Sequence, residues 1–373
     1  MKETIRRAPD SAARKQRPLQ VGFADARSRK LLDLQRSAGN AAVVQLLGAV
    51  QRQAPPAAPA AAPPQTVGQT EWTSTPALHA RYPTWQAYDA VRRVVAGWSS
   101  PAVADPLSYI TSAIAEWNAS PAMHSAFDNN FGGDAHRSYL NLKRLYQARG
   151  ISDPADYLAT NIVDITFYNR KTSGHDDLKK VLDAAETALT KAGHTFTLDK
   201  GTWSYVPRTY NNSINKLSNH ALGKAIDVNP SSNPHITSGS DFRVINAVCG
   251  TVLTAGLLAT ADYDTLHSAS DLFKQSFNDA WVTQQEQTLA TMQAQHPHPP
   301  GYAKQKALVK AIHQRRAALN GYAAHGFLNL PKALVEGLET AGLNWGGTWT
   351  SAKDFMHFDL PRELMPPEAA MNQ

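Results

Sequence analysis

Two short stretches, far apart in the chain, constrain this sequence more than any other feature. The first, SNHALGKAID at residues 218–227, places His220 and Asp227 seven residues apart, and the second, DFMHF, places His357 three residues after Asp354. Two imidazoles and one carboxylate make a complete three-ligand catalytic zinc set, with the fourth position left for water. The sequence therefore predicts that His220, Asp227 and His357 bind Zn²⁺. The remaining carboxylate, Asp354, is then free to act as a base.

The length and composition exclude several classes of protein. A chain of 373 residues is longer than the roughly 250–300 residues over which a single core usually grows, so more than one part is expected. No run approaches the ~20 apolar residues of a membrane span, so we expect no integral membrane segment. The single cysteine, Cys249, cannot form an internal disulfide and lies in an apolar run, which predicts a buried structural thiol. Folding in a reducing cytoplasm fits this composition.

The positive charge belongs to the start of the chain. Residues 1–53 carry 11 Lys and Arg against 4 Asp and Glu, whereas the remaining residues carry 26 against 27. A catalytic part without net positive charge gives no reason to expect nucleic acid as a partner.

The two stretches resemble a known group of enzymes. Residues 218–227 match the pattern S-x-H-x-x-G-x-A-x-D, which resembles that of the zinc peptidases grouped with lysostaphin, the D-alanyl-D-alanine metallopeptidases and hedgehog. The WGG at residues 345–347, together with DFMHF, resembles the L-alanyl-D-glutamate endopeptidase branch. The resemblance covers residues 155–365, apart from a helical insertion. It implies the three zinc ligands and the base named above, and it implies peptidoglycan stem peptides as the substrate of an endopeptidase or carboxypeptidase.

Three further residues are expected on the substrate side of the site, namely Arg208, Ser218 and Trp345. Arg208 resembles an arginine that in relatives lies ahead of the first motif and contacts substrate, and a guanidinium suits the carboxylates of stem peptides. The alternatives are a surface position for Arg208, a loop-holding role for Ser218 and core packing for Trp345.

The second stretch departs from the family pattern at one position and distinguishes two branches at another. Phe355 stands where the endopeptidase branch usually has proline, from which we expect a small local change without loss of activity. Position 354 holds an aspartate, which resembles the endopeptidase branch. A glutamate there would resemble the vancomycin-resistance type of carboxypeptidase. Asp359 shares a strand face with His357, and we expect it behind the ligands or in solvent.

The basic residues 1–53, which we call the leader, are expected to be a segment that loads the protein into a particle. Residues 1–28 are too polar to order, whereas 29–50 show the spacing of one amphipathic helix, which is not a secretory signal peptide. Periodicity alone also allows a membrane-surface helix or an organellar presequence. The sequence LQRSAGNAAV at residues 34–43 resembles a segment found near the start of many bacterial proteins associated with extracellular contractile injection systems. The resemblance implies a cargo that is made in the bacterial cytoplasm and then delivered or released to act on a cell wall.

The expected fold is α+β, with a small antiparallel sheet that carries the zinc site and flanking helices. The expected parts are a disordered basic leader at 1–53, an Ala/Pro linker at 54–69, a helical region of unknown role at 70–150, a peptidase domain at 151–366 with a helical insertion at about 262–325, and a tail at 367–373.

Smaller elements are also expected within these parts. Apolar spacing predicts three helices between residues 70 and 150, a helix over 176–192 that Gly193 ends, and a helix over 239–258. A helical hairpin is expected from one helix over 270–295 and another over 303–319. A β-hairpin is expected from the alternating residues 195–198 and 203–206, and strands are expected at 225–229 and 356–360.

Two other functions fit the same motifs. A phage-type endolysin would carry the same peptidase but is expected to add a wall-binding module, and the sequence shows no repeat of that kind. A hedgehog-like binding module would keep the zinc without turnover, but it has no need for a base at Asp354.

Overall fold

The computed structural model describes most of the chain after the linker. The described residues are 67–98, 102–119, 135–209 and 216–364. The predicted leader, almost all of the predicted linker and the predicted tail lie outside them. The chain from Gln65 onward forms one compact unit. No helix among the described residues is long and apolar enough to cross a membrane.

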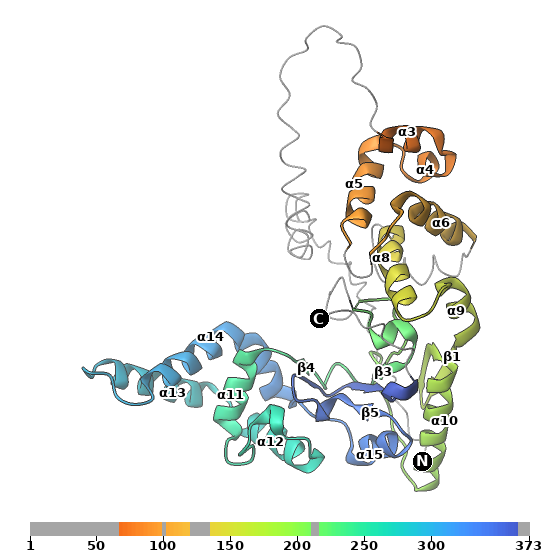
Figure 1. Ribbon diagram of the computed structural model, residues 1–373. Helices are drawn as coiled ribbons and strands as arrows, with labels where there is room; N and C mark the ends of the chain where they lie inside the picture. The colour runs from red at the N-terminus through yellow and green to blue at the C-terminus, as the bar shows by residue number, and fades with distance from the viewer. Residues whose placement is uncertain (1–66, 99–101, 120–134, 210–215, 365–373) are drawn as a thin grey trace, which may run out of the picture. The chain divides into compact units, whose positions relative to one another are not determined.

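Helices dominate the first part of this unit (Figure 1). They are α3 (Val67–Ser74), α4 (Pro76–Arg81), α5 (Trp85–Ala96), α6 (Pro106–Ala119), α8 (Ala135–Ala148) and α9 (Pro154–Asn161). In α5 the Thr84 side chain caps the N-terminus by accepting from the Ala87 amide, and the buried face carries Tyr88, Val91 and Val95. The three helices that the apolar spacing predicts between residues 70 and 150 are therefore confirmed as α5, α6 and α8.

A hairpin and a long helix follow. Strands β1 (Ile162–Phe167) and β2 (Arg170–His175) pair antiparallel and lead directly into α10 (Asp176–Lys191). The sequence predicts α10 correctly, and Gly193, with a φ of 85°, follows its C-terminus as expected of a helix stop signal. The pairing of β1 with β2 was not predicted.

Two small antiparallel sheets lie at the centre of the unit. One has the strand order β3–β7–β5, formed by Ala225–Asp227, His357–Asp359 and Asn344–Trp345. The other pairs β4 (His235–Ile236) with β6 (Lys353–Asp354). The expected α+β fold with a small antiparallel sheet and flanking helices is confirmed, and the predicted strands exist as shorter β3 and β7.

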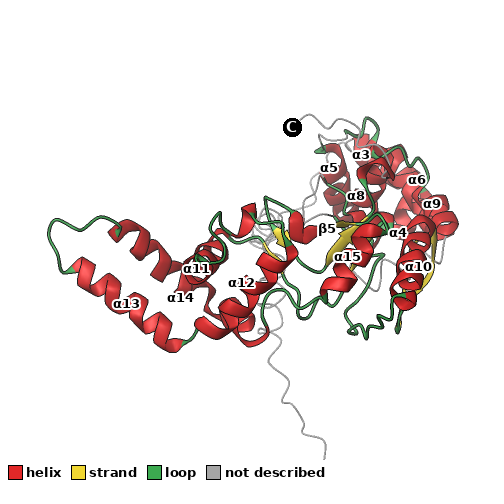
Figure 2. Cartoon of the chain, turned by 90° about the horizontal axis from the view of Figure 1, so that it is seen from below, coloured by secondary structure: helices red, strands yellow, loops and turns green. Residues whose placement is uncertain are grey.

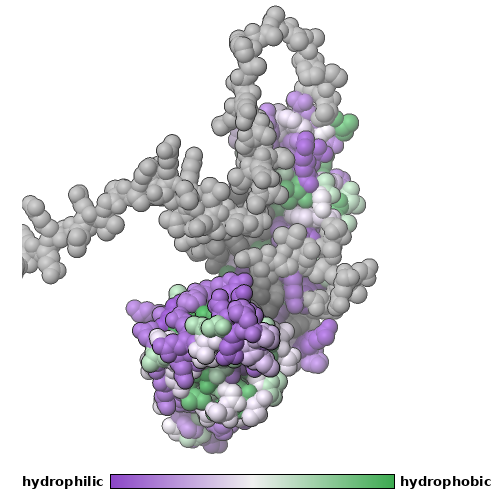
Figure 3. All heavy atoms as spheres, turned by 90° about the vertical axis from the view of Figure 1, so that its left-hand side faces the viewer, coloured by the Kyte–Doolittle hydropathy of each residue, from purple (hydrophilic) through white to green (hydrophobic). Residues whose placement is uncertain are grey.

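The remaining helices lie between the two predicted metal motifs. They are α11 (Gly239–Cys249), α12 (Tyr263–Ser276), α13 (Asp279–Gln293), α14 (Tyr302–His325) and α15 (Lys332–Thr340). Figures 1 and 2 show α13 and α14 side by side, and Figure 3, seen from this end, shows mainly hydrophilic residues with apolar ones between them. The predicted helical hairpin is confirmed.

The predicted helical insertion shares its core with the strands. Leu266 and Phe273 of α12 and Ile312 of α14 belong to the same buried cluster as Phe358 of β7. The buried ammonium of Lys353 also donates to the Thr260 and Gly347 carbonyls, at 2.6 and 2.8 Å. These helices are therefore part of the packing around the strands.

Three element predictions are corrected. Residues 195–198 form no strand, and Trp203 makes only an isolated bridge with Asp227, although the Asp199 side chain does accept from the Gly201 amide as in a turn. The helix expected over 239–258 ends at Cys249. The helix expected over 270–295 is two helices, because Asn278 leaves the helical conformation and caps α13 through the Trp281 amide.

The predicted burial of the single cysteine is confirmed. Cys249 lies in the core, where burial raises the pKa of its thiol to about 12, so the reactive thiolate is disfavoured.

Phe355 is the core residue whose removal tests this packing most directly. Its ring is fully buried against Phe327 and Trp345, so Phe355→Ala should lower the free energy of unfolding by about 3–5 kcal/mol in a urea titration. Leu364→Ala is the control, because Leu364 is 48% exposed and should change stability by no more than about 0.5 kcal/mol. Equal effects of the two substitutions would contradict the packing described here.

Candidate metal centre

The first motif folds as one tight turn followed by a strand. Residues Asn219–Leu222 form a 3-10 helix, η3, and the Ser218 hydroxyl caps it by accepting from the His220 amide at 3.3 Å. Gly223 then reverses the chain at a φ of 67°, where a Cβ atom would lie 2.5 Å from the Ile162 Cδ1 atom. This turn explains the glycine of the motif, since it leads the chain directly into β3.

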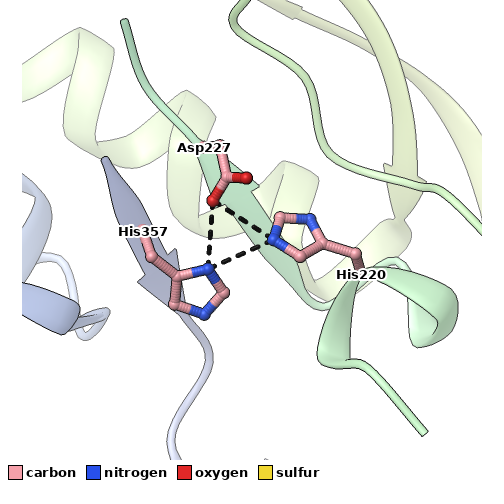
Figure 4. A group of neighbouring side chains, drawn as sticks. All are labelled: His220, Asp227 and His357. Atoms are coloured by element: carbon pink, nitrogen blue, oxygen red, sulfur yellow. Dashed lines mark hydrogen bonds and ion pairs between the residues drawn. The ribbon is translucent and has the colours of Figure 1, made fainter. Parts of the chain in front are cut away.

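Three side chains converge at the end of this turn (Figure 4). His220 comes from η3, Asp227 from β3 and His357 from β7. The His220 Nε2 and His357 Nδ1 atoms lie 3.1 Å apart, and the Asp227 Oδ1 atom lies 3.2 Å from the first and 3.1 Å from the second. All three side chains are buried. The fold therefore brings together the three residues that the sequence predicts as metal ligands.

The triangle of donor atoms has the size that zinc requires. Two ligand atoms at bond lengths of 2.0–2.1 Å from a tetrahedral ion lie about 3.3–3.4 Å apart. The observed sides of 3.1–3.2 Å are close to that value, so a small outward relaxation would accommodate the ion. The residues present fit a metal ion with nitrogen and oxygen ligands.

Partners behind the ligands fix their orientation. The His220 Nδ1 atom lies 2.7 Å from the Ser204 carbonyl oxygen, which can only accept, so the proton sits on Nδ1 and the Nε2 lone pair faces the centre. On the other side, His357 Nε2 lies 3.6 Å from Asp359 Oδ2, and this oxygen accepts from the side-chain Nδ2 of Asn219 at 2.8 Å. The expectation that Asp359 lies behind the ligands agrees with this geometry.

The electrostatics of the centre favour a cation. Burial opposes the charged forms, but the neighbouring imidazoles outweigh it for Asp227, whose pKa lies well below the usual range. Burial likewise opposes protonation of His357, but hydrogen bonding to Asp227 and Asp359 outweighs it and raises the pKa of His357 to about 10. The ionised Asp227 therefore attracts positive charge, whereas burial lowers the pKa of His220 and leaves it neutral with a free lone pair, as a metal ligand requires.

Asp354 lies in the same pocket as the three ligands. It is on β6, and burial raises the pKa of its carboxyl to about 7. Its Oδ1 atom is buried and has no hydrogen-bond partner among the described residues. A buried carboxyl with one oxygen left without a hydrogen bond and a pKa near 7 is suited to accept and release a proton near neutral pH.

His235 also belongs to this pocket, although sequence reasoning missed it. It is paired with Asp354 across β4 and β6, and its Nδ1 atom lies 3.8 Å from the Asp354 Oδ2 atom. A histidine directly after a proline, here Pro234, carries no spacing signal, so only the strand pairing reveals it.

The pocket, of roughly 470 Å³, contains two of the three residues expected near the substrate. Arg208 lies in its wall, with the guanidinium 5.0 Å from the centre of the Trp203 ring and a buried Nε atom that has no described partner. Ser218 lines the pocket as well as capping η3. Trp349 also lines it, with its ring 5.2 Å from that of His357.

Trp345 does not line the pocket. Its side chain is 1% exposed and donates to the Phe355 carbonyl at 3.0 Å, so the structure places it in the core and corrects the expectation of a substrate contact. The WGG segment instead packs directly against the backbone of the second motif. A Cβ atom added at Gly346 would lie only 2.5 Å from the Asp354 carbonyl oxygen, so this position requires glycine.

A comparison with family models gives one match. Residues 268–360 match the model described as D-alanyl-D-alanine carboxypeptidase. This C-terminal part of the chain is a metallopeptidase domain. The matched segment includes Asp354 and His357, and the other two ligands, His220 and Asp227, precede it. No match was found among the curated proteins or the solved structures that were compared.

Each of the three ligands should be needed for metal binding. His220→Ala, Asp227→Ala and His357→Ala should each weaken zinc binding by more than about 100-fold, because a remaining pair of ligands cannot enclose the ion. The dissociation constant can be measured by competition with a chromophoric chelator. His298→Ala is the matched control, since His298 is an exposed histidine beside His296 in the loop after α13. Zinc binding that survives in all three ligand variants would contradict the site.

Proposed function

We propose that this protein is a zinc-dependent peptidoglycan peptidase that cuts stem peptides. The observation that carries the proposal is the convergence of His220, Asp227 and His357 in one pocket with the buried Asp354, whose Oδ1 atom has no hydrogen-bond partner among the described residues. The family match to D-alanyl-D-alanine carboxypeptidases supports the substrate class. Zinc held by the three ligands would supply a Lewis acid for the scissile carbonyl and would make water acidic enough to attack near neutral pH.

The residues of the chain would handle protons and orient the substrate. Asp354 would take a proton from the attacking water and return it to the leaving amine, which a carboxyl with a pKa near 7 can do. Arg208 would bind a substrate carboxylate, because its guanidinium lies in the pocket wall and has one buried N–H without a hydrogen-bond partner among the described residues. Stem peptides offer such carboxylates at D-glutamate and at the terminal D-alanine.

Two indications about which peptide bond is cut point to different branches of the family. The matched family model is described as a carboxypeptidase, whereas the aspartate at position 354 resembles the endopeptidase branch. Release of D-alanine alone from purified peptidoglycan would identify a carboxypeptidase. Fragments with a new D-glutamate amino terminus would identify an endopeptidase, and mass analysis distinguishes the two.

Asp354 provides the sharpest test of catalysis. Asp354→Asn keeps the size of the side chain but removes the proton acceptor, so it should leave zinc affinity nearly unchanged and lower the cleavage rate by about 10²–10⁴-fold. Asp164→Asn, which changes an exposed carboxylate on β1, should cleave at the wild-type rate. Full activity of Asp354→Asn would reject the base, and zinc binding without any cleavage by the wild type would favour a hedgehog-like binding module.

We also propose that the protein is a cargo of a contractile injection particle, loaded through residues 1–53. The support is the resemblance of LQRSAGNAAV at 34–43 to a segment of proteins associated with such particles. The protein would be made in a bacterial cytoplasm and delivered to a cell wall. A phage-type endolysin is the competing possibility.

The loading proposal can be separated from the catalytic one. A variant that lacks residues 1–53 should lose association with particles, because the proposed loading segment is gone, and should keep its peptidase activity. Co-sedimentation with purified particles measures the first property and peptidoglycan digestion the second. Unchanged co-sedimentation of the shortened protein would refute the loading role.

A further inference from the structure

The turn that carries His220 has two backbone carbonyls that its own backbone does not satisfy. The Asn219 carbonyl accepts from the Lys224 amide at 3.0 Å, and the His220 carbonyl accepts from the Gly223 amide at 2.9 Å. The chain then turns away into β3. The last carbonyls of a helical turn have no partner within the turn, and buried ones must find another donor. Here these are the carbonyls of Ala221 and Leu222, both fully buried residues.

Two tyrosines from the N-terminal helices supply those donors. The Tyr146 hydroxyl of α8 donates to the Ala221 carbonyl, and the Tyr157 hydroxyl of α9 donates to the Leu222 carbonyl at 3.0 Å. The partners are separated by 75 and 65 residues in the chain. Burial raises the pKa of both hydroxyls above the ordinary value, so both remain neutral donors across the working range of pH.

The same helices bury the apolar side chains of the turn. Leu217, Ala221 and Leu222 belong to the hydrophobic cluster formed by α4, α5, α6 and α8, which is separate from the cluster beneath β7. His220 therefore lies between residues that are packed in the N-terminal helical core, whereas Ile226 and Phe358, next to the other two ligands, are packed in the other core.

We propose that the N-terminal helices are a positioning element of the metal centre, and that Tyr146 and Tyr157 act as positioning residues that hold the His220 turn in its metal-binding conformation. Through Tyr146 and the core that buries Ala221 and Leu222, this gives the helical region of residues 70–150 a role that does not require a separate wall-binding function. The inference rests on the proposed metal site, but the hydrogen bonds that carry it do not involve a metal ion.

The test compares Tyr146→Phe, Tyr157→Phe and the double variant with a matched control. Tyr109→Phe removes a tyrosine hydroxyl from the same helical core, where it donates to the Leu140 carbonyl at 2.8 Å, away from the turn. Amide hydrogen exchange of residues 217–227 is measured in the full-length, metal-free protein. Zinc affinity is measured by chelator competition.

The positioning role predicts a local effect. Exchange within residues 217–227 should accelerate, and zinc affinity should fall by about tenfold for each single tyrosine variant, which is the lower end of the loss seen when partners behind a metal ligand are removed. Tyr109→Phe should change neither quantity. Exchange that accelerates equally throughout the molecule, or that equals the control in residues 217–227, would overturn the proposal. A wild-type protein that binds no zinc would instead count against the proposed function. The hydrogen-exchange measurement alone would then decide whether the two tyrosines hold the turn.

Discussion

The metal centre depends on the antiparallel pairing of β3 with β7. In this register Asp227 lies directly opposite His357, so a pair of backbone segments places two of the three ligands side by side. Side chains of directly opposite residues lie close together on one face of a sheet, which fixes their direction as well as their distance. A shift of β7 by one residue relative to β3 would turn His357 to the face opposite Asp227 and separate the two ligands. The turn before β3 needs only to bring His220 alongside.

The centre combines groups that are costly to bury without one another. Asp227 and the two imidazoles are withdrawn from water, and burial of an unpaired charge carries a large penalty. A cation at the middle of the three donor atoms would satisfy all of them together, and its binding free energy would then stabilise the folded protein. Asp354 differs, because one of its oxygens has no described partner and remains available for chemistry.

The sequence was sufficient for the parts of the site that depend on local spacing. The three side chains that converge in the pocket, and Asp354 beside them, follow from residue types at fixed intervals. The helix α10 and the strands β3 and β7 follow from apolar patterns. Contacts made between distant segments left no such pattern. The pairing of β4 with β6 brings His235 to Asp354, and the isolated bridge of Trp203 with Asp227 replaces the expected hairpin. Trp345 illustrates the same point, since only packing decides whether an indole faces a core or a cleft.

The position of the ligands in the chain also bears on when the enzyme becomes active during its synthesis. His220 and Asp227 emerge from the ribosome before α11 to α15, and His357 emerges only after all of these helices. A nascent or prematurely terminated chain that lacks β7 has no complete centre, whatever the metal supply. Closing such a long loop is also a slow kind of folding step, because distant segments must meet before their contacts contribute. Hydrolase activity therefore cannot appear before β7 has been translated and has paired with β3.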